Sequence, residues 1–365
     1  MADSTLIWSA DNPQAQPNLT GVPGSYHGLV GRVVGIAQNK AGQILSRGVV
    51  GKTVNLAQSK FSPMQLEEVL NEFVAKNFKR TVMMWGPPGL GKSSIVAKVA
   101  QMHGIPVIDL RLGQLAPTDI RGIPSVIEGS NGGLTRWNPP AHYPQSGSGI
   151  LFLDEFNQAG AALQGIAQQL ILDRKVGDYV VPEGWFIWAA GNRRDHGASV
   201  NAMPKPVANR MVHLECVPNM DEWAVWAQAN LGSPMVLSYI MAKRSGKRDD
   251  FSPLLEMPKQ GQGTDDERFP TPRSWQLAAE LYELGCPIAP AVGQAQAESF
   301  RVFVDQYASI LERLKANEDV TITAQQQAEV SWLYVTTGST SKVKCASGEF
   351  PKVLEKVKNI LATEA

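Results

Sequence analysis

Residues 81–94 read TVMMWGPPGLGKSS, an apolar run that stops at a glycine-rich turn ending in Lys-Ser-Ser. The turn matches the pattern G-x-x-x-x-G-K-[ST], with Gly86, Gly91, Lys92 and Ser93 in register. Glycines let the backbone curl so that successive N–H groups point at phosphate oxygens, and the helix that follows adds its N-terminal dipole. Because the turn lies between a strand pattern and a helix pattern, we predict a phosphate-binding loop.

The whole loop is expected to contact a nucleotide. Lys92 would bridge the β- and γ-phosphates, and the Ser93 hydroxyl would ligate Mg²⁺. The alternative is a glycine turn with a nearby lysine. The predicted nucleotide-binding residues are Gly86, Pro87, Pro88, Gly89, Leu90, Gly91, Lys92, Ser93 and Ser94.

Polar residues end two later apolar segments. GILFLDEF is apolar up to Asp154, as in a strand buried on both faces of a parallel sheet. Asp154 is placed to hold the magnesium with its water shell, and Glu155 to orient and deprotonate an attacking water. Asn192 ends FIWAAGN, where its amide can position the same water. Solvated strand ends are the alternative explanation for all three.

The order of elements predicts an α/β fold. Five strands are expected at residues 80–85, 105–112, 149–156, 184–192 and 211–216, with helical stretches between most of them. A helix is expected after Ser62 as N-cap, with Pro63 at its first position. This alternation predicts a parallel sheet with right-handed crossovers.

Three parts of the chain are distinguished by composition and pattern. Residues 1–55 are rich in Gly, Asn, Gln, Ser and Pro, and are expected to form an extended arm with some strand character, packed on a neighbouring subunit or free. Residues 56–220 carry the α/β core. Residues 221–365 are expected to be all-helical, with a polar loop at 246–270.

Composition narrows the class of protein. The 365 residues contain 34 Lys plus Arg and 34 Asp plus Glu, and this zero net charge argues against a nucleic-acid coat. The three cysteines have no paired spacing, which indicates reduced thiols. No apolar run approaches the roughly 20 residues of a membrane span, and the N-terminus lacks a secretory pattern. We therefore expect a cytoplasmic protein without a membrane partner.

The succession of motifs resembles the AAA+ ATPases, and within them the MoxR-like, dynein-related branch. GPPGLGKSS resembles that family's Walker A motif, LFLDEFNQA its Walker B, WAAGN its sensor 1, VANRM its arginine-finger segment and TPRSW its sensor 2. The likeness covers roughly residues 55–290. Residues 122–140 and 171–186 are expected to form β-hairpins where the branch carries its helix-2 and pre-sensor-1 inserts. The fold implied is a P-loop NTPase core followed by a helical lid domain.

The resemblance implies further site residues. Arg210 would be the finger, acting in trans on the γ-phosphate in a neighbouring subunit, and Arg273 would contact the γ-phosphate in cis. Arg193 and Arg194 are candidates for an intersubunit contact. The alternative for these arginines is a surface or salt-bridge role. Two positions depart from the family: Gln158 stands where relatives often have Arg, and Met211 where an aromatic is usual.

The activity implied is hydrolysis of ATP with Mg²⁺ in a homo-oligomeric ring, most simply a hexamer. The resemblance implies chaperone-like remodelling or activation of a partner, such as a protein with a von Willebrand factor A domain or a metalloenzyme. One alternative is a nucleic-acid motor or loader that uses Arg136, Arg174 and Lys175 on the hairpins. Another is a regulatory switch that binds ATP without turnover.

Overall fold

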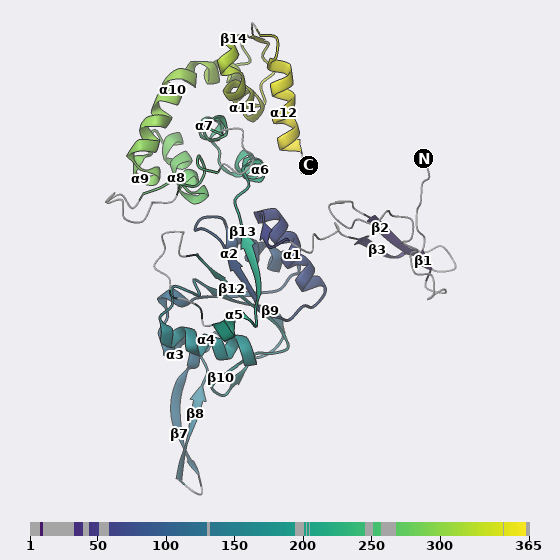
Figure 1. Ribbon diagram of the computed structural model, residues 1–365, viewed down its shortest axis with the longest axis vertical. Coiled ribbons are helices and arrows are strands. Elements are labelled where there is room, and N and C mark those ends of the chain that lie inside the picture. The colour runs from purple at the N-terminus through teal and green to yellow at the C-terminus, as the bar shows by residue number, and fades with distance from the viewer. Residues whose placement is uncertain are drawn as a thin grey trace. The chain divides into compact units, whose positions relative to one another are not determined.

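The computed structural model (Figure 1) divides into two compact units, residues 1–59 and 60–365. In the first unit the structure describes three strands. The described residues of the chain are 8–9, 33–38, 44–50, 58–129, 132–193, 201, 203, 205–244, 251–256, 268–345 and 347–362.

The strands of the first unit form a small sheet in the order β1-β2-β3. β1 (Trp8–Ser9) pairs with β2 (Val33–Gln38) in parallel, and β2 pairs with β3 (Ile44–Val50) antiparallel. The expected strand character of this region is therefore confirmed. The remainder of residues 1–55 lies outside the described residues, so the extended arm stays a prediction.

The second unit contains a six-stranded sheet in which every neighbouring pair is parallel. The five predicted strands are all present. The sixth, at one edge, was not predicted because two residues give no periodic pattern. In spatial order the strands are β4 (Lys60–Phe61), β13 (Val212–Cys216), β5 (Val82–Trp85), β12 (Gly184–Gly191), β9 (Ser148–Asp154) and β6 (Val107–Arg111).

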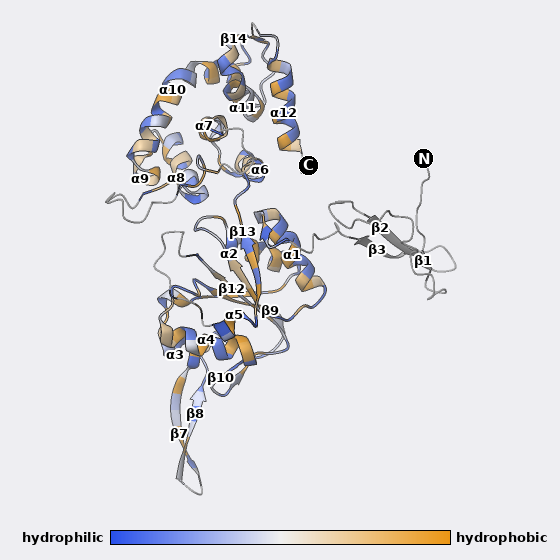
Figure 2. Ribbon diagram, in the orientation of Figure 1, coloured by the Kyte–Doolittle hydropathy of each residue, from blue (hydrophilic) through white to orange (hydrophobic). Residues whose placement is uncertain are grey.

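Helices cover both faces of this sheet, which explains the nearly continuous apolar strands. Val82 and Met84 of β5 pack with residues of α1 (Pro63–Ala75) and α2 (Lys92–Met102). Met83, between them, faces the other way and packs with residues of α4 (Ala161–Asp173). Figure 2 shows helices that carry both apolar and polar residues, as expected when one side lies on the core.

The start of α1 confirms the cap predicted from the sequence. The Ser62 hydroxyl accepts a hydrogen bond from the Gln65 N–H at 3.3 Å, and the Gln65 side chain accepts one from the Ser62 N–H at 3.2 Å. Pro63 is the first helical residue, where its missing N–H costs nothing.

Both expected hairpins are present. β7 (Ile123–Gly129) pairs antiparallel with β8 (Gly132–Asn138) after the short helix α3 (Pro117–Arg121), and Figure 1 shows this hairpin projecting from the core. β10 (Lys175–Val176) pairs with β11 (Tyr179–Val180) just before β12. Residues 130–131 of the first turn lie outside the described residues.

The turn of the second hairpin contacts the base of the first. The backbone N–H of Trp137 donates to Asp178 Oδ2 at 2.7 Å, and the Arg121 guanidinium lies 4.1 Å from the centre of the Trp137 ring. The exposed length of the first hairpin therefore starts from a fixed base.

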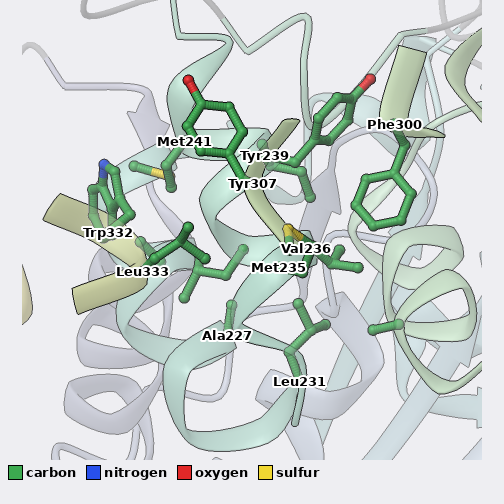
Figure 3. Close-up of a cluster of buried hydrophobic side chains, with 14 of the residues drawn as sticks. Ala227, Leu231, Met235, Val236, Tyr239, Met241, Phe300, Tyr307, Trp332 and Leu333 are labelled. Atoms are coloured by element: carbon green, nitrogen blue, oxygen red, sulfur yellow. The ribbon is translucent and has the colours of Figure 1, made fainter. Parts of the chain in front are cut away.

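The C-terminal part is helical, as predicted. Aromatic and aliphatic side chains from several helices, including Tyr239, Phe300 and Trp332, form one core (Figure 3). No helix among the described residues is both long and apolar enough to cross a membrane. The helices are α6 (Met220–Asn230), α7 (Pro234–Ala242), α8 (Pro272–Glu283), α9 (Ala289–Val292), α10 (Gln294–Lys315), α11 (Gln327–Thr337) and α12 (Phe350–Ala362).

One detail of that prediction was wrong, because two strands interrupt the helices. β14 (Val320–Ile322) and β15 (Val343–Cys345) pair in parallel. The Asp319 carboxylate accepts the Lys342 N–H at 3.3 Å beside this pair. Three-residue strands whose partner lies more than 20 residues away leave no local signal in the sequence.

Trp275 tests the helical core. Its side chain is fully buried and its indole N–H donates to the Pro253 carbonyl at 3.0 Å. Trp275→Ala should lower the free energy of unfolding by about 3–5 kcal/mol, as measured by urea denaturation. The control is Leu277→Ala on the same helix, where the side chain is half exposed and about 1 kcal/mol or less is expected. Equal losses in the two variants would contradict the packing described.

Candidate nucleotide-binding site

The loop between β5 and α2 has a conformation that its glycines make possible. Gly89 and Gly91 have φ angles of 81° and 79°, in the left-handed region that favours glycine. At Gly86 a Cβ would lie 2.7 Å from the carbonyl oxygen of Cys216 on β13, so the close approach of the two backbones requires glycine. The loop therefore curls toward the start of α2 at Lys92, where helix N–H groups are free to meet an anion.

The other predicted residues of this loop divide by burial. Leu90 is buried and anchors the loop in the core beside α2. Pro87 supplies a carbonyl group to Lys92, and Pro88 lies half-buried beside it. Ser94 is exposed on the first turn of α2, facing the cleft described below.

The Lys92 side chain is buried within the loop. Its ammonium group donates to the carbonyl oxygens of Gly86 at 2.8 Å and Pro87 at 2.9 Å. It also donates to the side-chain oxygen of Asn192 at 3.2 Å. One cation thus joins the loop to the end of β12, two segments about a hundred residues apart in the chain.

Burial lowers the pKa of Lys92 to about 8, with the nearby Arg273 charge adding to the decrease and the Asp154 carboxylate opposing it. All three hydrogen bonds of the ammonium group go to uncharged oxygens. An arriving phosphate would supply the negative charge that such a site lacks, and would favour the charged form of the lysine.

The side chains of Ser93 and Asp154 are in contact at the carboxyl end of β9, which lies two strands from β5 in the sheet. The Ser93 hydroxyl donates to Asp154 Oδ2 at 2.6 Å, and Asp154 Oδ1 accepts the backbone N–H of Glu155 at 2.8 Å. Asp154 is the last residue of β9, as the sequence predicted. A hydroxyl and a carboxylate oxygen beside a phosphate loop suit Mg²⁺, a hard cation that prefers oxygen ligands.

Among the described residues, no group of three or more His, Cys, Asp or Glu side chains could hold a metal ion. Mg²⁺ is commonly held by one or two protein oxygens, with phosphates and waters completing its shell. The donor set at Ser93 and Asp154 therefore fits this ion, bound together with a nucleotide.

Glu155 has an unusual backbone. Its φ of 55° lies in the left-handed region, which is uncommon for residues other than glycine and is found at functional sites. Its carboxylate lies beside Gly113, after the end of β6, where a Cβ would come within 2.9 Å of Glu155 Oε2. Sequence reasoning missed Gly113, because no local pattern connects it with Glu155.

Asn192 is held by a second asparagine that the sequence analysis also missed. The Asn157 side chain accepts the Asn192 N–H at 3.2 Å and donates to the Asn192 carbonyl at 2.5 Å. Asn157 is buried, two residues after Glu155. A buried amide that pairs with a strand end fixes the backbone of Asn192, and its side chain is then free to reach Lys92.

Arg273 lies near the phosphate loop of its own chain, as the prediction of a role in cis requires. It is the second residue of α8, whose N-cap is Thr271. A Cβ on Gly89 would lie 3.1 Å from the Thr271 Cβ and 3.6 Å from the Arg273 Cβ. The Arg273 side chain itself is exposed.

Arg210 follows the short helix α5 (Lys205–Ala208) and is exposed. Within the described residues, no hydrogen bond or ion pair links its side chain to the phosphate loop of the same chain. Arg193 is engaged in its own chain, 3.5 Å from Glu215 and 4.8 Å from the centre of the Trp85 ring. Arg194 lies outside the described residues.

A cleft of about 460 Å³ adjoins the phosphate loop. Loop residues Gly89 to Gly91 form one wall, and residues of α1, α2, α6 and α8 form the others. Its lining includes the apolar side chains of Leu90, Trp223 and Trp226. The volume and the apolar walls are those of a small-molecule site, next to the loop where phosphates would bind.

Comparison with known families agrees with this geometry. The family model described as "ATPase family associated with various cellular activities (AAA)" matches residues 82–193. That span contains the phosphate loop, Asp154, Glu155 and Asn192. Residues 82–193 therefore match an AAA ATPase domain, and this match supports nucleotide binding.

Two proteins named midasin are similar in part. The chain is 26% identical to midasin of Dictyostelium discoideum over 147 residues, which is 37% of this chain and 2% of that protein. It is 24% identical to midasin of Giardia intestinalis over 207 residues, which is 53% of this chain and 4% of that protein. The chain thus spans a small fraction of the length of these relatives.

Two solved structures resemble the chain at low similarity. A RuvB mutant from Thermotoga maritima is 13% identical with a TM-score of 0.37, covering 69% of this chain and 74% of that one. NtrX from Brucella abortus in complex with ADP is 13% identical with a TM-score of 0.34, covering 68% of each chain. Similarity at this level supports no conclusion about the site.

The lowered pKa of Lys92 predicts that nucleotide affinity depends on pH. Below about pH 8 the lysine is charged and meets the phosphates as a cation, whereas at higher pH binding must first take up a proton. The Kd for Mg-ATP, measured by calorimetry, should be about 25-fold weaker at pH 9.5 than at pH 7.5. Adenosine, which lacks phosphates, is the control and should show no such change. An ATP affinity that is constant across this range would contradict the assignment.

Proposed function

We propose that this chain hydrolyses Mg-ATP as a subunit of a homo-oligomeric ring, most simply a hexamer, and thereby remodels or activates a partner protein. The observation that carries the proposal is the meeting of Lys92, Ser93, Asp154 and Asn192 at one edge of the sheet. These four residues supply what a phosphate chain and its cation need: a buried ammonium, a hydroxyl, a carboxylate and an amide.

Each residue has a distinct role in this proposal. The loop from Gly86 to Ser94 binds the phosphates, and the base and ribose occupy the adjoining apolar cleft. Ser93 and Asp154 hold Mg²⁺, which when bound neutralises phosphate charge. Asn192 positions the attacking water, and Glu155 accepts its proton.

Two arginines complete the site. Arg273 contacts the γ-phosphate from the same chain, which its place beside Gly89 supports. Arg210 reaches the γ-phosphate of a neighbouring subunit, which its exposure supports. A guanidinium at that position stabilises the charge that develops in the transition state.

The biological role we propose follows the MoxR-like branch of AAA+ ATPases. The two hairpins at the positions of the branch's inserts support this choice. The partner would be a separate protein, such as one with a von Willebrand factor A domain. We further propose that residues 1–55 act as an arm, 56–220 as the ATPase core and 221–365 as the lid and its extension.

One observation disfavours the alternative of a nucleic-acid motor. The Arg174 guanidinium, one of the three hairpin cations that could contact phosphates, donates to the carbonyls of Pro182 at 3.1 Å and Trp185 at 2.6 Å. It therefore serves the second hairpin's own structure.

Glu155→Gln tests the role of the proposed base. The amide cannot accept a proton, so steady-state phosphate release should fall at least a hundredfold, while ATP still binds and favours the assembled ring. The exposed Glu183 gives a control, since Glu183→Gln should keep wild-type turnover. Wild-type turnover in Glu155→Gln would remove Glu155 from the catalytic residues.

Arg210→Ala tests the finger. Turnover should fall about a thousandfold with ATP affinity retained, because the transition state loses a cation that the ground state does not need. Lys205→Ala, which removes another exposed cation from the same short segment, is the control and should retain turnover.

Mixing separates action in trans from action in cis. Lys92→Ala subunits cannot bind ATP but present an intact Arg210 to their neighbours. Adding them to Arg210→Ala subunits should restore part of the phosphate release. Failure to restore activity at every mixing ratio would count against a finger that acts in trans.

A further inference from the structure

We infer that His213 is a positioning residue, which holds the Arg210 segment in a fixed place relative to the phosphate loop of its own chain. The inference rests on the proposed function, since it assumes that Arg210 acts on a neighbouring nucleotide. It adds a residue that neither the sequence motifs nor the family match single out.

The first contact joins His213 to the base of the phosphate loop. Trp85 is the last residue of β5, and Gly86 of the loop follows it directly. The Trp85 indole N–H donates to Nδ1 of His213 at 2.8 Å, and the two rings are nearly parallel, with an interplanar angle of 11°. His213 lies on β13, the strand paired with β5.

The second contact joins His213 to the Arg210 segment. Nε2 of His213 lies 2.7 Å from the carbonyl oxygen of Ala208, the last residue of α5. Arg210 comes two residues later, in a turn. The backbone N–H of Arg210 donates to the Val207 carbonyl at 3.1 Å. The bond at Ala208 therefore acts on the backbone that carries Arg210.

The two contacts fix the protonation of the ring. An indole N–H can only donate, so Nδ1 must be the acceptor. A carbonyl can only accept, so Nε2 must carry the proton. The neutral Nε2–H form satisfies both bonds at once, and each nitrogen has one defined task.

Buried residues on either side of Arg210 anchor the segment in the core. Val207 and Met211 are buried in the core beside α4, whereas Arg210 between them is exposed. The buried pair fixes where the segment leaves the core, and the bond from His213 fixes its orientation. Met211, which stands where the family usually has an aromatic residue, thus serves packing and takes no part in the contacts of His213.

Trp85 also touches the segment after Asn192. The Arg193 guanidinium lies 4.8 Å from the centre of the Trp85 ring and 3.5 Å from Glu215, two residues beyond His213 on β13. The base of the phosphate loop, the end of β12 and the Arg210 segment therefore share one set of side chains. His213 therefore connects the phosphate loop of a chain with Arg210, the arginine that the same chain would place in the neighbouring site.

The experiment compares three substitutions at His213. Because the imidazole is exposed, the substitutions open no cavity, and the loss of its hydrogen bonds should lower the thermal unfolding midpoint only slightly. The amide nitrogen of Gln reaches the position of Nε2 and keeps the bond to Ala208 but not the acceptor for Trp85, so His213→Gln should keep a turnover between those of wild type and His213→Ala. The shorter amide of Asn reaches only the position of Nδ1, so His213→Asn and His213→Ala should lose kcat at least tenfold with KM for ATP unchanged.

Mixed rings test where the defect acts. If His213 serves the finger, then His213→Ala subunits should be rescued by Lys92→Ala subunits, which carry an intact finger. They should not be rescued by Arg210→Ala subunits, which lack the finger too. His142→Ala, at another exposed histidine, is the control and should behave as wild type throughout.

Two results would overturn the inference. One is wild-type turnover in His213→Ala. The other is the reverse rescue, by Arg210→Ala and not by Lys92→Ala, which would assign His213 to its own phosphate loop through Trp85. Failure of the proposed function has a different signature, namely full turnover in Arg210→Ala itself.

Discussion

The hydrogen bonds of the Lys92 ammonium group are the interaction on which this site depends. A buried cation is costly unless its protons are matched by acceptors. Here the acceptors are two carbonyls of the loop itself and the side chain of Asn192. The loop must therefore curl back on Lys92, and the end of β12 must lie beside it. The first requirement concerns the path of the loop backbone, which the glycines make possible. The second concerns the position of β12, which the order of strands in the sheet determines.

The order of strands meets the second requirement. β5 lies between β13 and β12, and β9 follows β12. Since all these strands are parallel, their carboxyl ends meet at one edge. The loop after β5, Asp154 at the end of β9 and Asn192 after β12 thus come together although they are far apart in sequence. The same order brings His213 on β13 against Trp85, on the side that leads to Arg210.

Much of this arrangement could be predicted from sequence, for a physical reason. Strands buried on both faces are continuous apolar runs, and the loop motif, the Ser62 cap and the hairpins have local signatures. Asp154 and Asn192 were predicted because each ends such a run. The roles of Glu155, Arg210 and Arg273 stay predictions, because they concern a bound nucleotide and a neighbouring copy of the chain.

Other features had no local signature. Asn157 and Gly113 matter through their contacts with Asn192 and Glu155, and such contacts are set only when the sheet has formed. β4, β14 and β15 are two or three residues long, too short for a periodic pattern. No motif in the sequence includes His213, and its contacts form only because β13 lies beside β5.

The central claim is that this edge of the sheet is a Mg-ATP hydrolysing site. Its most direct test is phosphate release by the purified chain and by Asp154→Asn, measured in parallel with and without Mg²⁺. The wild-type chain should release phosphate only when Mg²⁺ is present. Asp154→Asn should lose at least a hundredfold in rate while it still binds ATP. Equal rates in the two proteins, or a rate that is indifferent to Mg²⁺, would contradict the account.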